Sequence, residues 1–105
     1  MRKIEQEISD AVLNGDRFSG GNTVVVTSNS KTECFLHGYK LFQLDRKTGK
    51  FKWNDCGWAT RTTASRLNAC FEAVKNLIGK KYHYNFNSGK VLDVDAQEEI
   101  AHQRF

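Results

Sequence analysis

Apolar residues recur three and four positions apart over residues 62–78, which is the spacing of one face of an α-helix. Thr62 or Thr63 is the expected N-cap of this central helix, and Gly79 is the expected residue at its C-terminal end. Lys80 and Lys81 follow, where positive charge is favourable to the helix dipole. The members of the apolar stripe are Leu67, Cys70, Phe71, Val74, Leu77 and Ile78.

A second, shorter helical stripe lies near the start of the chain and is followed by runs typical of strands. The stripe predicts an N-terminal helix over residues 2–14 that stops at Gly15. Short polar connections separate the runs that follow, so neighbouring strands are expected to pair antiparallel, because parallel neighbours need long crossovers. The expected strands span residues 23–27, 33–37, 39–45 and 50–56.

Alternating aromatic residues after the central helix predict a second hairpin. Tyr82, Tyr84 and Phe86 share one face of a strand, and a turn at 87–90 leads back through 91–94. The tail from Asp95 to Phe105 is expected to form a short helix capped by Asp95. The whole order predicts an α+β fold in which an antiparallel β-meander of about five to six strands packs against an N-terminal helix and a central amphipathic helix.

The length of 105 residues indicates a single domain over residues 1–105. No apolar run approaches the roughly 20 residues that cross a bilayer, and the first ten residues are charged, so we expect a cytoplasmic protein without a membrane partner. The three cysteines, Cys34, Cys56 and Cys70, are an odd number without a close pair. They therefore indicate no disulfide framework and a reducing compartment.

The formal charge of +4 is unevenly distributed. The region from Lys31 to Lys90 holds twelve basic and four acidic residues, whereas the two flanks together are acidic. Such a basic middle would attract an anionic partner, unless the acidic ends fold back on it and neutralise it.

Two stretches of the chain have a distinctive order of residues. The first is Leu36-His37-Gly38, and the second runs Gly57-Trp58-Ala59-Thr60-Arg61-Thr62-Thr63-Ala64-Ser65-Arg66-Leu67-Asn68-Ala69. With these two stretches the chain resembles a group of small bacteriophage-encoded proteins of unassigned function. The resemblance covers about the middle third of the chain. It implies a viral origin and expression inside a bacterial cell, and it implies no particular activity.

The second stretch places hydroxyl groups and two arginines at the expected start of the central helix. Thr62, Thr63, Arg61 and Arg66 could bind an anion together with the free N–H groups of the first helical turn. The commoner alternative is that the threonines only cap the helix while the arginines pair with acidic residues elsewhere in the fold.

Trp58 and a basic turn are further candidates for contact with a partner. Trp58 could stack on a base or fill a partner pocket, although we expect a large apolar side chain to lie in the core of a small domain. The turn carrying Arg46, Lys47, Lys50 and Lys52 could follow a phosphate backbone. Lysines at hairpin tips also serve ordinary solvation and protect sheet edges.

The sequence predicts no cofactor, no metal site and no enzymatic activity. Cys34 and His37 form one close pair, but Cys56 and Cys70 are too far apart in sequence to resemble the second pair of a zinc site. The three histidines are scattered, and the chain carries no nucleophile elbow, metalloprotease motif or phosphate-binding loop.

Together these features predict a non-enzymatic phage protein that binds a host protein or nucleoprotein complex through a basic surface, as host-takeover or anti-defence inhibitors do. One alternative is a module that binds DNA or RNA directly, and another is a minor virion or assembly protein. The prediction assumes that the basic residues of the central region gather into one continuous patch.

Overall fold

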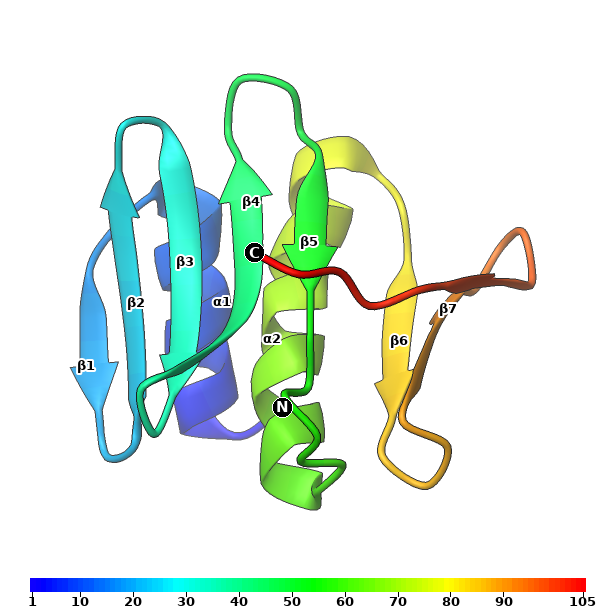
Figure 1. The fold of residues 1–105 in the computed structure, drawn as a ribbon. Coiled ribbons are helices and arrows are strands. Elements are labelled where there is room, and N and C mark those ends of the chain that lie inside the picture. The colour runs from blue at the N-terminus through cyan, green and yellow to red at the C-terminus, as the bar shows by residue number, and fades with distance from the viewer.

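The computed structural model describes residues 1–105, which form two helices, a five-stranded sheet and a three-stranded sheet (Figure 1). The α+β prediction is confirmed. The helices are α1 (Lys3–Asn14) and α2 (Arg61–Ile78). The strands are β1 (Phe18–Gly20), β2 (Thr23–Ser28), β3 (Lys31–Leu36), β4 (Tyr39–Asp45), β5 (Phe51–Trp53), β6 (Tyr82–Asn85), β7 (Lys90–Asp93) and β8 (Glu98–Ile100).

The larger sheet is a meander in the order β1-β2-β3-β4-β5, with every neighbouring pair antiparallel. The two-residue turn between β2 and β3 has positive φ at Asn29 and Ser30, as a tight hairpin turn requires. The turn between β3 and β4 has positive φ at His37 and Gly38. Strand β1 was not predicted, because three residues that include a glycine show no alternation.

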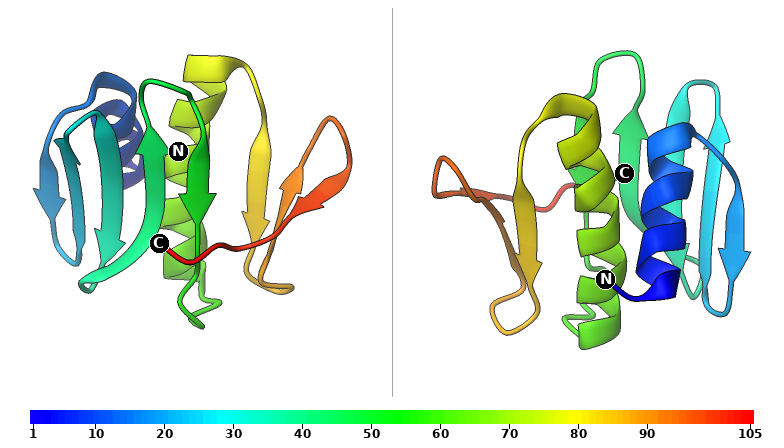
Figure 2. Two further views of the ribbon diagram at one scale, coloured as in Figure 1. Left: turned by 45° about the horizontal axis from the view of Figure 1, so that its top comes forward. Right: turned by 180° about the vertical axis from the view of Figure 1, so that it is seen from behind.

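Both helices cover the same face of the larger sheet and lie side by side (Figure 2). The inner face of the sheet and the apolar stripes of the helices form the core, because each element can bury only one apolar face. The C-terminal segment crosses the opposite face near β4 and β5 (Figure 1). Fully buried members of the core include Ile8, Val12, Val25, Phe42, Leu67, Phe71 and Val74.

Aromatic contacts join β5 to the smaller sheet. The ring of Phe51 meets Tyr82 at 4.8 Å between centroids, and Trp53 meets Tyr84 at 5.7 Å, both edge to face. Such pairs stabilise beyond the area that they bury. The expected alternation over 50–56 is therefore correct for Phe51 and Trp53, although strand β5 ends at Trp53 rather than at residue 56.

The predicted helix in the tail is wrong, because residues 98–100 form β8 on the edge of β7. Asp93 Oδ1 accepts hydrogen bonds from the backbone N–H groups of Asp95 and Ala96, so it closes a turn between the strands. The indole of Trp53 then donates to the carbonyl of Ile100. Pairing with an available strand edge thus outweighs a weak helical pattern.

The ends of the helices are set by one threonine and two glycines. Gly15 and Gly79 adopt the left-handed conformation at the C-terminal ends of α1 and α2, as predicted. The N-cap of α2 is Thr60 instead of Thr62 or Thr63, because Thr60 Oγ1 accepts the backbone N–H of Thr63 at 3.1 Å. Neither helix has the length and apolar composition that a membrane-spanning segment needs.

Candidate binding surfaces

The β2–β3 and β4–β5 turns lie at the same end of the molecule as the C-terminal ends of both helices (Figure 1), and these segments are rich in basic residues. We call this the basic end. The acidic residues there are Asp16 and Asp45, and Asp45 Oδ1 accepts the backbone N–H groups of Lys47 and Thr48. The basic residues include Arg17, Lys31, Arg46, Lys47, Lys50 and Lys80.

Arg46 is bound within the fold. Its guanidinium donates to the carbonyls of Val12 and Leu13 at 2.7 and 2.8 Å, and to Thr32 Oγ1 at 2.9 Å. These carbonyls belong to the last turn of α1, where they lack helical partners and carry partial negative charge. Arg46 therefore fastens the β4–β5 turn to α1.

The four lysines of the basic end are exposed, and none takes part in an ion pair. The β4–β5 turn borders a notch of about 290 Å³ whose apolar lining comes from Leu44, Val74, Leu77 and Ile78. Leu77 and Ile78 are 41% and 43% exposed. The basic end therefore combines unpaired positive charge with accessible apolar surface.

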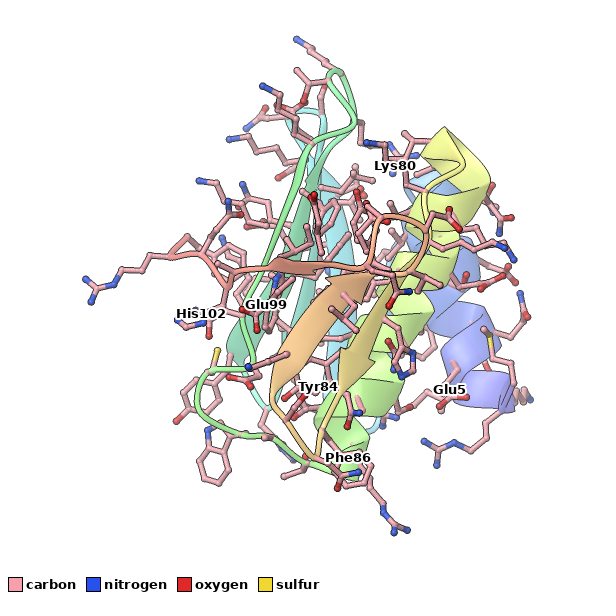
Figure 3. All side chains as sticks on the ribbon, turned by 90° about the vertical axis from the view of Figure 1, so that its right-hand side faces the viewer. Glu5, Lys80, Tyr84, Phe86, Glu99 and His102 are labelled. Carbon is pink, nitrogen blue, oxygen red and sulfur yellow. The ribbon has the colours of Figure 1, made fainter.

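The other predicted anion-binding residues lie at the opposite end of α2. Figure 3 shows Lys80 at one end of this helix and Phe86 at the other, and the guanidinium of Arg61 lies 5.6 Å from the centroid of the Phe86 ring. The expected single continuous patch does not form. Lys52 lies between the two ends, on β5, where it is exposed.

Of the four predicted anion-binding residues at this opposite end, two are exposed and two are buried. Arg61 and Thr62 are exposed, whereas Thr63 is fully buried and Arg66 is only 7% exposed. Arg66 donates to Thr23 Oγ1, Ser65 Oγ and Asn22 Oδ1 at 2.9, 3.0 and 3.2 Å. Burial, together with the nearby charge of Arg2, lowers the pKa of Arg66. Arg66 therefore connects α2 to the β1–β2 turn.

A polar network that the sequence did not reveal continues from Arg66 to α1. Ser65 Oγ donates to Glu5 Oε2 at 2.6 Å, and it accepts hydrogen bonds from Arg2 and Arg66. Burial by itself would raise the pKa of Glu5, but the hydrogen bonds from Ser65 and Arg2 outweigh it and the pKa is lowered. The network holds the start of α1 against α2.

Trp58 is 58% exposed, so its expected place in the core is wrong. The preceding residues, Cys56 and Gly57, both have positive φ, which turns the chain away from the sheet after β5. Asp55 Oδ1 accepts the backbone N–H of Gly57 at 3.0 Å, and Asp55 Oδ2 accepts the hydroxyl of Tyr84 at 2.7 Å. The loop before α2 is thus fixed with its indole outside.

A cleft of about 550 Å³ lies between this loop and the β3–β4 turn, and we call it the aromatic cleft. It brings together residues from 36–38 and 57–69, the two stretches that carry the resemblance to phage proteins. Both loops contain the same backbone feature, which is a non-glycine residue of positive φ followed by a glycine. It occurs at His37-Gly38 and at Cys56-Gly57. The cleft is lined by Asn22, Leu36, His37, Tyr39, Leu41, Asp55, Trp58, Thr60, Thr62 and Thr63.

Cys34 and Cys70 lie close together, but they do not converge with Cys56 and the histidines into one cluster. Cys34 and Cys70 are buried in the core, whereas His37 is exposed on the β3–β4 turn. Cys56 is half-buried, and its pKa is raised mainly by this burial and to a smaller extent by the charge of Asp55. All three thiols are free, and no group of three or more potential metal ligands lies close enough together to hold an ion.

The chain is thus a small α+β protein with two antiparallel sheets and two helices on one face of the larger sheet. Its two separate surface features are the basic end and the aromatic cleft. The chain belongs to the family described as Kyanoviridae Gp96 protein, which it matches over residues 1–103. The resemblance to phage-encoded proteins is thereby confirmed at the level of the family. No curated protein and no solved structure matches the chain significantly.

Proposed function

We propose that this phage protein is a non-enzymatic binding protein that contacts a host protein, or a host nucleoprotein complex, through its basic end. The observation that carries the proposal is the set of exposed lysines without ion pairs at this end, of which Lys47 lines the notch. Unpaired positive charge of this kind attracts and orients an acidic partner.

The apolar part of the notch favours a protein partner over a bare phosphate backbone. Phosphate contacts require cations but gain nothing from the exposed side chains of Leu77 and Ile78. Protein interfaces, in contrast, combine an apolar centre with a polar rim. An acidic protein surface that presents one apolar side chain would match both features.

The residues of the basic turn take different parts in this proposal. Lys47 and Lys50 contact the partner, while Arg46 holds the turn in place through α1. Lys52 is exposed on β5 and does not line the notch, so it would add only long-range attraction.

The test is capture of host proteins from infected cells by immobilised wild-type protein and by the variants Lys47→Glu and Leu77→Ser. Lys3→Glu is the matched control, because it makes the same charge change at an exposed site at the other end of the molecule. We expect the wild type and Lys3→Glu to retain the same host protein. The affinity for this host protein should fall on the order of tenfold in the two notch variants, Lys47→Glu and Leu77→Ser.

Nuclease treatment and salt distinguish the kinds of partner. A protein or nucleoprotein partner remains bound after nuclease treatment, whereas purely nucleic-acid-mediated capture is lost and would weaken steeply with salt. Equal capture by the wild type and both notch variants would contradict the proposal.

A further inference from the structure

The aromatic cleft lies away from the basic end, and the proposed function does not use it. We propose that this cleft binds an unpaired base of single-stranded nucleic acid. The inference stands on its own observations and is independent of the proposed protein partner.

Two exposed aromatic rings supply the first argument. Tyr39 and Trp58 are 54% and 58% exposed, and they line the same cleft from the start of β4 and from the loop before α2. Aromatic side chains on water-exposed loops are typical of sites where bases stack, because every base offers a flat face. Buried Leu36 and Leu41 add apolar surface to the lining.

The size of the cleft and the hydrogen bonds at its borders indicate a ligand site rather than an incidental gap. Its volume of about 550 Å³ lies within the roughly 300–1,000 Å³ that is usual for small-ligand sites. Both borders are held by hydrogen bonds, from the His37 backbone N–H to the carbonyl of Asn22 and from Cys56 Sγ to the carbonyl of Lys40. A site that is already ordered loses less entropy when it binds.

The charges around the cleft disfavour a cationic ligand. Asp55 is the only carboxylate in the lining, and both of its oxygens already accept hydrogen bonds, from Gly57 and Tyr84. The guanidinium of Arg61 lies over the ring of Phe86 and does not line the cleft. Because both oxygens of the Asp55 carboxylate are already engaged, a neutral flat ring is favoured over an arginine or lysine side chain.

Polar groups at the rim suit the edge of a base. The Thr62 side chain is exposed and has no hydrogen-bond partner within the protein, and His37 presents an exposed imidazole whose hydrogen-bond partner is the Asn22 amide at 3.4 Å. Such groups can donate to or accept from the ring nitrogens and carbonyls of a base. An apolar peptide side chain would leave them without partners.

The test measures binding of a fluorescently labelled oligothymidylate of about ten nucleotides, by anisotropy at low salt. We expect Trp58→Ala and Tyr39→Ala each to weaken binding about 5- to 150-fold, the effect of losing a stacking contact. Leu92→Ala is the matched control and should change the affinity much less, because it truncates a similarly exposed apolar side chain on β7, outside the lining of the cleft. Both aromatic side chains are exposed, so their removal leaves the core intact.

Intrinsic fluorescence gives a second readout. Trp53 is buried, so a change in tryptophan emission on binding reports Trp58, and it should be absent in Trp58→Phe. Thymidine monophosphate serves as a separate arm, and we expect it to bind more weakly than the oligonucleotide. The inference would be overturned if the single strand did not bind at all. Equal binding by Trp58→Ala, or loss of binding only in Leu92→Ala, would also overturn it, because either result would place the contact elsewhere.

Discussion

Positively charged residues of this protein serve two different purposes. Arg46 and Arg66 are engaged within the fold, whereas Lys47 and Lys50 are exposed and make no ion pairs. The difference follows from chemistry, because a guanidinium has five directed donors and can satisfy several oxygens of the fold at once. The sequence identified the charges but could not show which carbonyls would lie within their reach.

Replacement of Arg46 tests its structural role. We expect Arg46→Met to lower the free energy of unfolding by about 1–3 kcal/mol, because it leaves the carbonyls of Val12 and Leu13 without their charged donor. Lys47→Met should change it by less than about 0.5 kcal/mol, since Lys47 is exposed. Urea denaturation followed by circular dichroism measures both. Equal effects of the two substitutions would refute this role.

Among the elements, the long amphipathic helix was the easiest to predict and the strands β1 and β8 were the hardest. The predicted range 62–78 differs from α2 by a single residue, because several turns of apolar periodicity leave little ambiguity. Strands β1 and β8 depend on neighbours that the chain supplies elsewhere, so their residues carry no comparable pattern. The N-cap was misassigned because Thr60, Thr62 and Thr63 are locally equivalent candidates.

The start of α2 provides a paired test of the capping residue. Thr60→Ala should lower the free energy of unfolding by about 0.5–2 kcal/mol, because it removes the acceptor of the Thr63 backbone N–H. Thr62→Ala should have an effect within about 0.5 kcal/mol, since the Thr62 side chain is exposed and makes no hydrogen bond. Thermal or urea unfolding measures the difference. A larger effect at Thr62 than at Thr60 would contradict the structure.

For the molecule as a whole, the direction of the strands explains why the basic residues separate. The β4–β5 turn and the loop before α2 lie at opposite ends of β5, so a single strand is enough to part Lys47 from Arg61. The meander predicted from the sequence already implied this alternation. The same alternation brings the β3–β4 turn beside the loop before α2 and so creates the aromatic cleft.

The network of Glu5, Ser65 and Arg66 joins α1, α2 and the β1–β2 turn, so it predicts a pH dependence of global stability. The pKa of Glu5 is lower in the folded protein than its ordinary value of 4.5, so its contribution is present above that pH and is lost as the pH falls through the folded value. Glu5→Gln should therefore destabilise the protein at neutral pH.

Under acidic conditions the two proteins should converge. Urea unfolding at a series of pH values should show the difference between the wild type and Glu5→Gln shrinking as the pH falls below 4.5. Glu7→Gln is the control, because Glu7 is exposed and makes no side-chain hydrogen bond, and it should match the wild type throughout. A difference for Glu5→Gln that did not depend on pH would show that the carboxylate charge contributes nothing.

Local patterns in the chain were sufficient for the class of fold, the two helices, the hairpins and the apolar residues of the core, because periodicity and turn chemistry act over a few neighbouring residues. Long-range contacts decided the burial of Arg66, the exposure of Trp58 and the strand at the tail. Each of these depends on which distant backbone or side-chain groups come within hydrogen-bonding or packing distance. That proximity is a property of the folded chain and leaves no local trace in the order of its residues.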